Sequence, residues 1–513
     1  MGIMKEGRLF ARVLLLCLWG LALLCVVPAQ AEEEPEAENI TKAVIILKGS
    51  SEVGARYSHD GNYLTHNTYG PEDILSVRPR SPHTRMGTLY FRLGAPGAEM
   101  ILRQYDGQDN LLLTSELRAE GYCYAVGLEA DCCRAEITAQ AEPFQLYEFM
   151  VLGQGRLPDQ LPLPKPPVER TDFLIVTTHP DDEWIFLGAV YPIYAGEQGY
   201  TGTFAYVTTP NIGRLHEAIN SVWAANMGTT PYFLGFPDVD RSSPQHLKDT
   251  FKADEVTMAL VRLYRKIKPL VVVTQDPVNG EYGHWQHIVT AKSALEAARL
   301  ASDPTCDPDS AAEFGTWTVK KVYQHLAADN PIILDVTSPL SAYGGETALQ
   351  VAKRAFDQHR SQKKYIYRPS IGKNSKGDIR YFGLTYTTVG PDTGNDMFEH
   401  IGQNELAQNI LSATPAPEAA LTPEPTPMPT AAPTPTPMPI STPEPTASAP
   451  VPTDAPPTLA PTAVPEVTIS PTQAPAAASE REGNVLWHGG AAAALLLGAA
   501  ALIILRRRNR NKT

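Results

Sequence analysis

Two clusters of histidine and carboxylate residues are the part of this sequence that could do chemistry. The first is His179–Glu183 (HPDDE), and the second, about a hundred residues later, is Tyr282–His287 (YGHWQH). Each cluster follows an apolar run typical of a buried strand, Phe173–Val176 and Leu270–Val273. Residues just past the carboxyl ends of parallel strands converge at one crevice. Imidazoles and carboxylates brought together there suit a catalytic zinc ion, which takes about three protein ligands and one water. The two clusters therefore predict a metal-dependent hydrolase.

The spacing within each cluster supports this interpretation. His179 and Asp182 are three residues apart at a strand-to-helix junction, which places both side chains on one side of the first helical turn. His284 and His287 have the same spacing at the start of a later predicted helix. In the alternative interpretation, Asp181 and its acidic neighbours only cap the helix. The second cluster, in the expected place, argues against that alternative.

From Thr171 onward, strand and helix patterns alternate, which predicts an α/β fold with a Rossmann-like, doubly wound parallel sheet. The predicted strands are 173–177, 203–207, 232–235 and 270–275, and the predicted helices are 184–195, 214–226, 252–267 and 284–301. A strand near 319–326, a helix at 345–358 and a hairpin-like region to about 401 are expected to follow.

A smaller all-β domain is expected before this one. Short β-type runs lie at 43–48, 88–93, 99–105, 134–138 and 145–152, with turn residues between them. Several short strands without helical periodicity predict a β-sandwich. Its last run, Leu146–Gly153, resembles the closing strand of galactose-binding-like sandwiches. An accessory carbohydrate-binding module and a structural spacer are both open interpretations.

The motifs of the α/β domain resemble the LmbE/PIG-L family of zinc-dependent N-deacetylases, which includes GlcNAc-PI de-N-acetylase. The resemblance covers about residues 171–401. It rests on the HPDDE and YGHWQH clusters and on Arg214-x-x-Glu217, Leu234–Asp238 (LGFPD) and His359-x-Ser361-Gln362. The same family includes the deacetylases of the mycothiol and bacillithiol pathways.

The resemblance implies a role for each site residue. One catalytic zinc ion would be bound by His179, Asp182 and His287, although iron remains an alternative. Asp181 would be the general base, and His284, assisted by Tyr282, would stabilise the oxyanion and protonate the leaving amine. Two further positions of the family match Arg214 and Asp238, which would contact sugar hydroxyls. The alternatives for these two are a surface ion pair with Glu217 and an aspartate that forms a turn.

One departure from the family pattern concerns the pair between the two histidines. The family usually has Pro-Asp there, and this sequence has Trp285-Gln286. An aspartate beside the acid histidine would raise the pKa of that histidine, and Gln286 cannot supply the charge. We therefore expect either a lower pH optimum for acid assistance or another carboxylate in this role. Trp285 could instead offer a stacking face to a sugar.

The two ends of the chain predict export and tethering. Residues 1–31 have the basic start, apolar run and small-residue cleavage site of a signal peptide. Residues 485–505 are long and apolar enough for a transmembrane helix, and the basic tail 506–513 is expected to stay in the cytoplasm. Residues 412–480, which hold 20 of the 46 prolines, predict an extended linker. The expected folded parts are 40–158 and 168–405, outside the membrane of a Gram-positive cell.

Net charge and cysteine content limit which partners and disulfides can be expected. The net charge is −13 and the only basic cluster beyond the leader is the tail, so nucleic acid is a poor partner. Export permits disulfides between Cys123 and Cys132 or Cys133, but spacing cannot assign the pairing, and Cys306 has no obvious partner.

Together, these features predict a cell-surface enzyme that removes the N-acetyl group from an amino sugar or glycoconjugate. A second hypothesis is a surface glycan-binding protein that has lost activity, which the intact Asp181 and three metal ligands oppose. Esterase or amidase action on other substrates would use the same site.

Overall fold

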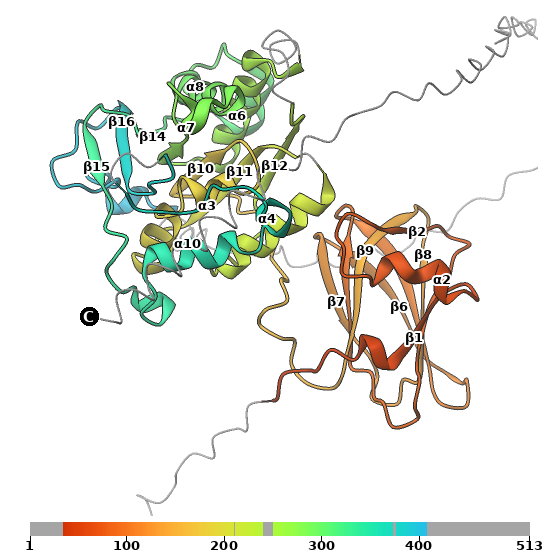
Figure 1. The fold of residues 1–513 in the computed structure, drawn as a ribbon. Helices are drawn as coiled ribbons and strands as arrows, with labels where there is room; N and C mark the ends of the chain where they lie inside the picture. Colours follow the sequence, from red (N-terminus) through yellow and green to blue (C-terminus); the bar gives the residue numbers. More distant parts are fainter. Residues whose placement is uncertain (1–33, 210, 240–249, 373–375, 408–513) are drawn as a thin grey trace, which may run out of the picture. The chain divides into compact units, whose positions relative to one another are not determined.

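The structure is a computed structural model, and it describes residues 34–209, 211–239, 250–372 and 376–407 (Figure 1). All of these lie in one compact unit, Met1–Thr422. The predicted signal peptide, proline-rich linker, transmembrane helix and basic tail lie outside the described residues and stay predictions. Among the residues that are described, none of the helices has the length and apolarity needed to cross a bilayer.

The first part of the described chain contains two antiparallel sheets. The five-stranded sheet has the order β1-β3-β8-β5-β6 and the four-stranded sheet the order β2-β9-β4-β7. The strands are β1 (Val44–Lys48), β2 (Asn67–Tyr69), β3 (Leu75–Pro79), β4 (Thr88–Leu93), β5 (Ala98–Tyr105), β6 (Leu111–Ala119), β7 (Cys123–Gly127), β8 (Arg134–Ala139) and β9 (Phe144–Leu152). One short helix, α2 (Glu52–Ala55), follows β1.

These two sheets share one apolar core. Leu102 and Ile137 of the five-stranded sheet and Phe91 and Phe149 of the four-stranded sheet belong to the same buried cluster. In β5, buried and half-buried residues alternate, as expected when one face of a strand packs inward. The five strands predicted from the sequence are present, and β2, β3, β6 and β7 are additional.

The cysteines of the described residues do not pair. Cys123, Cys132, Cys133 and Cys306 are all free thiols. Burial raises the pKa of Cys132 to about 11, so its thiol is a poor nucleophile near neutral pH.

The second part contains a seven-stranded sheet in the order β12-β11-β10-β13-β14-β16-β15. Its strands are β10 (Phe173–Thr177), β11 (Gly202–Thr208), β12 (Tyr232–Phe236), β13 (Val271–Thr274), β14 (Lys321–His325), β15 (Pro331–Ile333) and β16 (Tyr381–Thr387). The first five of these strands run parallel, as predicted. The last two pair antiparallel, so the sheet is mixed and the prediction of a purely parallel sheet was wrong at this edge.

Helices cover both faces of this sheet because its central strands are apolar on both sides. In β10, Phe173 and Ile175 enter one core, whereas Leu174 and Val176 enter another. Figure 1 shows α4 and α10 on one side of β10 and β11, and α6 and α8 on the other. The helices of this part are α3 (Asp182–Ile185), α4 (Ile212–Ala224), α6 (Ala253–Ile267), α7 (Gly280–Gly283), α8 (Trp285–Leu300), α9 (Pro308–Phe314) and α10 (Ala348–Phe356).

The helix predicted at 184–195 is the main local correction. The structure has the four-residue helix α3 and then a π-helix, η3 (Pro192–Glu197). Pro192 begins η3; it lacks a backbone N–H and its ring clashes with a helical turn before it, so a continuous α-helix is disfavoured. The other predicted helices and strands of this part agree with the structure to within a few residues.

Candidate active site

The two histidine clusters meet at the carboxyl edge of the seven-stranded sheet. Strands β10 and β13 are parallel neighbours, with Ile175 opposite Val273. His179 follows β10 by two residues, and His284 and His287 lie at the start of α8, after β13. The convergence predicted from strand order is therefore present in the fold.

Three donor atoms form a tight triangle at this edge. Oδ2 of Asp182 lies 3.0 Å from Nδ1 of His179 and 3.1 Å from Nε2 of His287, and the two nitrogens are 3.3 Å apart. Ligands of a tetrahedral zinc ion, at about 2.0–2.2 Å from the metal, are roughly 3.3–3.5 Å from one another. These three side chains, which are the ligands that the family resemblance implies, therefore fit a metal ion.

A second choice of three ligands is possible at the same place. Donor atoms of His179, His284 and His287 all lie within 4.8 Å of one another. We favour the triangle that includes Asp182 because its three edges are close to the spacing of zinc ligands. This choice leaves His284 beside the metal position, where it can act on a substrate.

The charges of the triangle are strongly coupled. Burial alone would raise the pKa of Asp182, but His287 and His179 hold that pKa well below its usual value. Burial would likewise lower the pKa of His287, and the Asp182 and Glu281 carboxylates instead raise it to about 10. The cluster therefore attracts positive charge, which suits a divalent cation.

Asp181 is held in an unusual backbone conformation next to the triangle. Its φ of 131° is rare for a residue other than glycine. The backbone N–H of Asp181 donates to Oε2 of Glu183 at 2.7 Å, and Nη2 of Arg214 donates to Oδ1 of Asp181 at 2.8 Å. Burial raises the pKa of Asp181 to about 7, against the opposing charge of Arg214. A carboxylate with such a pKa, beside a metal position, suits a general base.

Glu183 links the HPDDE cluster to a distant motif. Its Oε1 lies 2.7 Å from Nε2 of His359 and accepts a hydrogen bond from Ser221 at 3.1 Å. Two residues after His359, Ser361 donates its backbone N–H and its hydroxyl to Glu217, at 2.8 and 2.7 Å. His359 and Ser361 of this motif thus brace the elements around Asp181, and Gln362 of the same motif lines the pocket.

The rings of His284 and Tyr282 lie close to the histidines of the triangle. The ring of His284 is 4.7 Å from the ring of His179, between centroids, and stacks on His287 at 4.5 Å. Tyr282 lies 5.7 Å from His284 and stacks on Tyr367 at 4.5 Å with an interplanar angle of 21°. Both side chains line the pocket, as a proton donor and its assistant would require.

Arg214 and Asp238, the two residues that the family resemblance assigns to sugar hydroxyls, also line the pocket. Arg214 forms an ion pair with Asp181, and Glu217 binds Ser361 instead of Arg214. Asp238 has its Oδ1 at 3.4 Å from Nε2 of His179 and its Oδ2 at 3.6 Å from Arg214. Burial would raise the pKa of Asp238, but His179, Arg214 and His284 hold it below the usual value.

Gln286, which replaces the usual aspartate, turns toward the loop that carries Asp238. Its Nε2 donates to the carbonyl of Pro237 at 3.0 Å, and its Oε1 accepts from the backbone N–H of Val239 at 3.2 Å. The same Oε1 lies 3.4 Å from Nε2 of His179. Gln286 therefore clamps the loop that brings a carboxylate, Asp238, close to the histidines.

These residues surround a pocket of about 440 Å³. Besides the predicted residues, Ile185, Phe186, Val239, Gln362, Tyr365 and Tyr367 line it. Trp285 does not, and its side chain is 48% exposed, so its stacking on a sugar in this pocket gains no support. Nothing in the sequence pointed to Tyr365 and Tyr367 except their place shortly after the His359 motif.

Comparison with known proteins agrees with the site. Residues 174–298 match the family model of GlcNAc-PI de-N-acetylase, PIG-L. The chain is 30% identical over 191 residues to 1D-myo-inositol 2-acetamido-2-deoxy-alpha-D-glucopyranoside deacetylase 1 of Catenulispora acidiphila, covering 31% of this chain and 57% of that protein. It is 34% identical over 183 residues to the corresponding deacetylase of Streptomyces avermitilis, covering 29% and 59%. The chain thus spans less than two thirds of the length of these relatives.

Among solved structures, the N,N'-diacetylchitobiose deacetylase from Pyrococcus horikoshii is similar, with 19% identity and a TM-score of 0.30. That similarity covers 37% of this chain and 70% of the other. The family match itself spans β11, β12, β13 and nearly all of β10 and α8, together with both histidine clusters. Residues 174–298 are therefore a PIG-L family domain, as their motifs predicted.

Proposed function

We propose that this protein is a zinc-dependent N-deacetylase that hydrolyses the acetamide of an N-acetylated amino sugar or glycoconjugate. The observation that carries the proposal is the carboxylate of Asp181, whose side chain is 13% exposed, beside the donor triangle of His179, Asp182 and His287. One zinc ion held by that triangle would supply Lewis-acid activation of water and of the acetamide carbonyl.

The protein's own residues supply the remaining chemistry. Asp181 accepts the proton of the water that attacks the carbonyl carbon, and Arg214 keeps its carboxylate oriented. His284 donates a proton to the nitrogen of the leaving amine as the C–N bond breaks. The hydroxyl of Tyr282, which lines the same pocket, donates toward the oxygen on which negative charge develops. The products are acetate and a free amino sugar.

The pocket and the relatives support an amino-sugar substrate. A volume of about 440 Å³ is in the range of pockets for small ligands, and it holds polar groups from several elements. Arg214 and Asp238 can bind sugar hydroxyls from this position. The named relatives are, by their names, deacetylases of an acetamido-sugar that is linked to inositol.

We also propose that the enzyme works outside the cell, anchored by residues 485–505. The support is the leader-like sequence of residues 1–31, the apolar stretch and the basic tail. An exported and tethered deacetylase would meet wall, capsule or host glycans of a Gram-positive bacterium rather than cytoplasmic thiol precursors.

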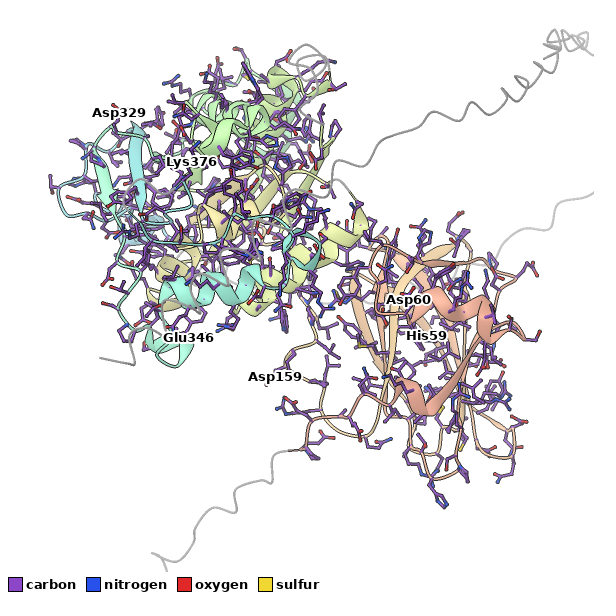
Figure 2. The ribbon with its side chains drawn as sticks, in the orientation of Figure 1. His59, Asp60, Asp159, Asp329, Glu346 and Lys376 are labelled. Carbon is purple, nitrogen blue, oxygen red and sulfur yellow. The ribbon has the colours of Figure 1, made fainter. Side chains whose placement is uncertain are left out.

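Acetate release from N-acetylglucosamine and its oligomers, measured with and without a chelator, tests the activity. We expect release by the untreated protein, loss on chelation and recovery on adding Zn²⁺. Asp181→Asn should lower kcat by at least about a hundredfold, since general-base catalysis contributes about 10²–10⁴-fold. The control is Asp329→Asn, at an exposed aspartate between β14 and β15 (Figure 2).

The outcome also separates the competing function. A protein that binds the same sugars with no acetate release, with zinc bound, would be a glycan-binding protein and not an enzyme. Acetate release from simple esters or non-sugar amides alone would show that the substrate is not an amino sugar. The strained backbone of Asp181 favours the enzyme, because binding alone gives no reason to hold a base there.

A further inference from the structure

A buried carboxylate outside the predicted site lies directly behind one of the metal-binding histidines. Glu281 is only 1% exposed, and its Oε2 lies 2.6 Å from Nδ1 of His287. Nε2 of the same ring faces Asp182 in the donor triangle. The imidazole of His287 is therefore held from both sides, with one nitrogen for the metal position and the other for Glu281.

The backbone at Glu281 is bent to bring its side chain to this position. It has φ 59° and ψ −59°, outside the helical values of the surrounding turn, α7. A residue other than glycine is rare at such angles, and it persists only where the surroundings hold it. The backbone N–H of Asp276 donates to Oε1 of Glu281 at 2.8 Å, which fixes the carboxylate against the end of β13.

A second histidine, His325, contacts the carboxylate of Glu281. His325, the last residue of β14, has Nδ1 at 3.2 Å from Oε1 of Glu281 and Nε2 at 2.9 Å from the carbonyl oxygen of Asp378. Both ring nitrogens thus face oxygen atoms, and these two contacts fix the ring of His325 against Glu281.

We propose that Glu281 and His325 are a positioning pair that fixes the ring of His287 for metal binding. The inference rests on the proposed function, because it assigns His287 to the metal. A carboxylate that accepts the outer N–H of a metal-binding histidine fixes the ring orientation and makes the ring a stronger ligand. His325 acts one step further out, by holding the Glu281 carboxylate in place.

A purely structural role would give different results. Glu281 could merely fill a buried polar gap, and its replacement would then destabilise the fold without changing the metal site. The test must therefore measure the metal itself and not only activity. Glu281→Gln is the sharpest variant because it keeps the shape and one oxygen acceptor while it removes the charge.

The experiment uses the full chain, stripped of metal and titrated with Zn²⁺ against a chromophoric chelator. We expect Glu281→Gln to weaken Zn²⁺ binding by about 10–100-fold and to alter the absorption spectrum of bound Co²⁺. With saturating Zn²⁺, kcat should fall while KM changes little. His325→Gln should weaken Zn²⁺ binding several-fold. This variant tests the positioning pair if Glu281→Gln does not fold.

The matched control is Asp172→Asn. Asp172 is a buried carboxylate just before the start of β10, at the opposite end of the strand from His179, and it accepts backbone N–H groups of Thr201 and Ala407. Its replacement should leave Zn²⁺ affinity and the Co²⁺ spectrum unchanged. Wild-type-like affinity and spectrum in folded Glu281→Gln or, failing that, in His325→Gln would overturn the proposal. A wild-type chain that binds no Zn²⁺ would instead refute the proposed function.

Discussion

Arg214 holds the carboxylate that we propose as the base: its Nη2 lies 2.8 Å from Oδ1 of Asp181. The same guanidinium also bonds the carbonyl of Pro180, so it contacts two consecutive residues of the HPDDE cluster. Arg214 comes from α4, which Asn211 caps through a side-chain hydrogen bond to the backbone N–H of Arg214. The helix terminus thus sets where the guanidinium reaches the base, and a role in substrate binding alone would not require these contacts.

We expect Arg214→Gln to act mainly on kcat. Without the guanidinium, Asp181 loses a charged hydrogen-bond donor that orients it, and kcat should fall by about 10–100-fold, since charge-assisted hydrogen bonds contribute about 1.5–3 kcal/mol. Steady-state kinetics on an acetamido-sugar measures this. Arg354→Gln, at an arginine that pairs with Glu346 on the edge of α10, is the control. A raised KM with unchanged kcat would assign Arg214 to the substrate instead.

Gln286 should matter through the loop that it clamps. In Gln286→Ala the carbonyl of Pro237 and the N–H of Val239 lose their partner, and Asp238 between them is released from its position. We therefore expect KM to rise about tenfold, with a smaller loss in kcat, because Asp238 lines the pocket. Trp285→Ala, next in sequence and exposed, is the control and should be close to wild type in both constants. Equal effects of the two replacements would contradict the clamp.

Much of the site could be predicted from the sequence because it depends on short-range features. Apolar runs such as Val271–Val273 are typical of buried strands, and the first polar residues after them lie at the carboxyl edge of the sheet. That argument placed His179, His284 and His287 together. The α/β order could also be predicted, since apolar strand-like runs alternate with helix-like segments from Thr171 to about residue 301.

The rest depended on contacts between distant residues, which local patterns do not report. Glu281 reaches His287 only because of a bent backbone, and His325, which stabilises it, lies 44 residues further on. From the sequence, Gln286 was interpreted only as the loss of the aspartate charge that the family usually has at this position. Its contact with Pro237, 49 residues earlier, could not be inferred from the helix alone. The antiparallel direction of β15 and β16 likewise depends on how the two strands pair with each other. Neither strand has a distinctive sequence pattern of its own.

The stacking of Tyr282 on Tyr367 gives a prediction with an internal control. Tyr367→Phe keeps an aromatic ring at 4.5 Å from Tyr282 and should leave kcat near the wild-type value. Tyr367→Ala removes the ring, so Tyr282 loses the contact that fixes its orientation, and kcat should fall about tenfold. Kinetics of the two variants under the same conditions decides it. Similar losses in both would mean that the hydroxyl of Tyr367, and not the stacking, is what matters.

Glu148 on β9 should make the first part of the protein less stable as pH rises. Burial raises its pKa to about 7 from an ordinary value of 4.5, although the N–H of Gly61, in the loop marked by His59 and Asp60 in Figure 2, donates to it at 2.9 Å. The folded state therefore holds this proton more tightly than the unfolded chain, and stability is lost between about pH 4.5 and 7, by on the order of 3 kcal/mol.

Glu148→Gln stays neutral, so its advantage in stability over wild type should grow through this window. Hydrogen exchange of amides in β4 and β9, converted to opening free energies, measures it, with exposed Glu116→Gln as control. Parallel curves for wild type and Glu148→Gln from pH 4.5 to 8 would show that the carboxylate ionises in the folded protein without cost.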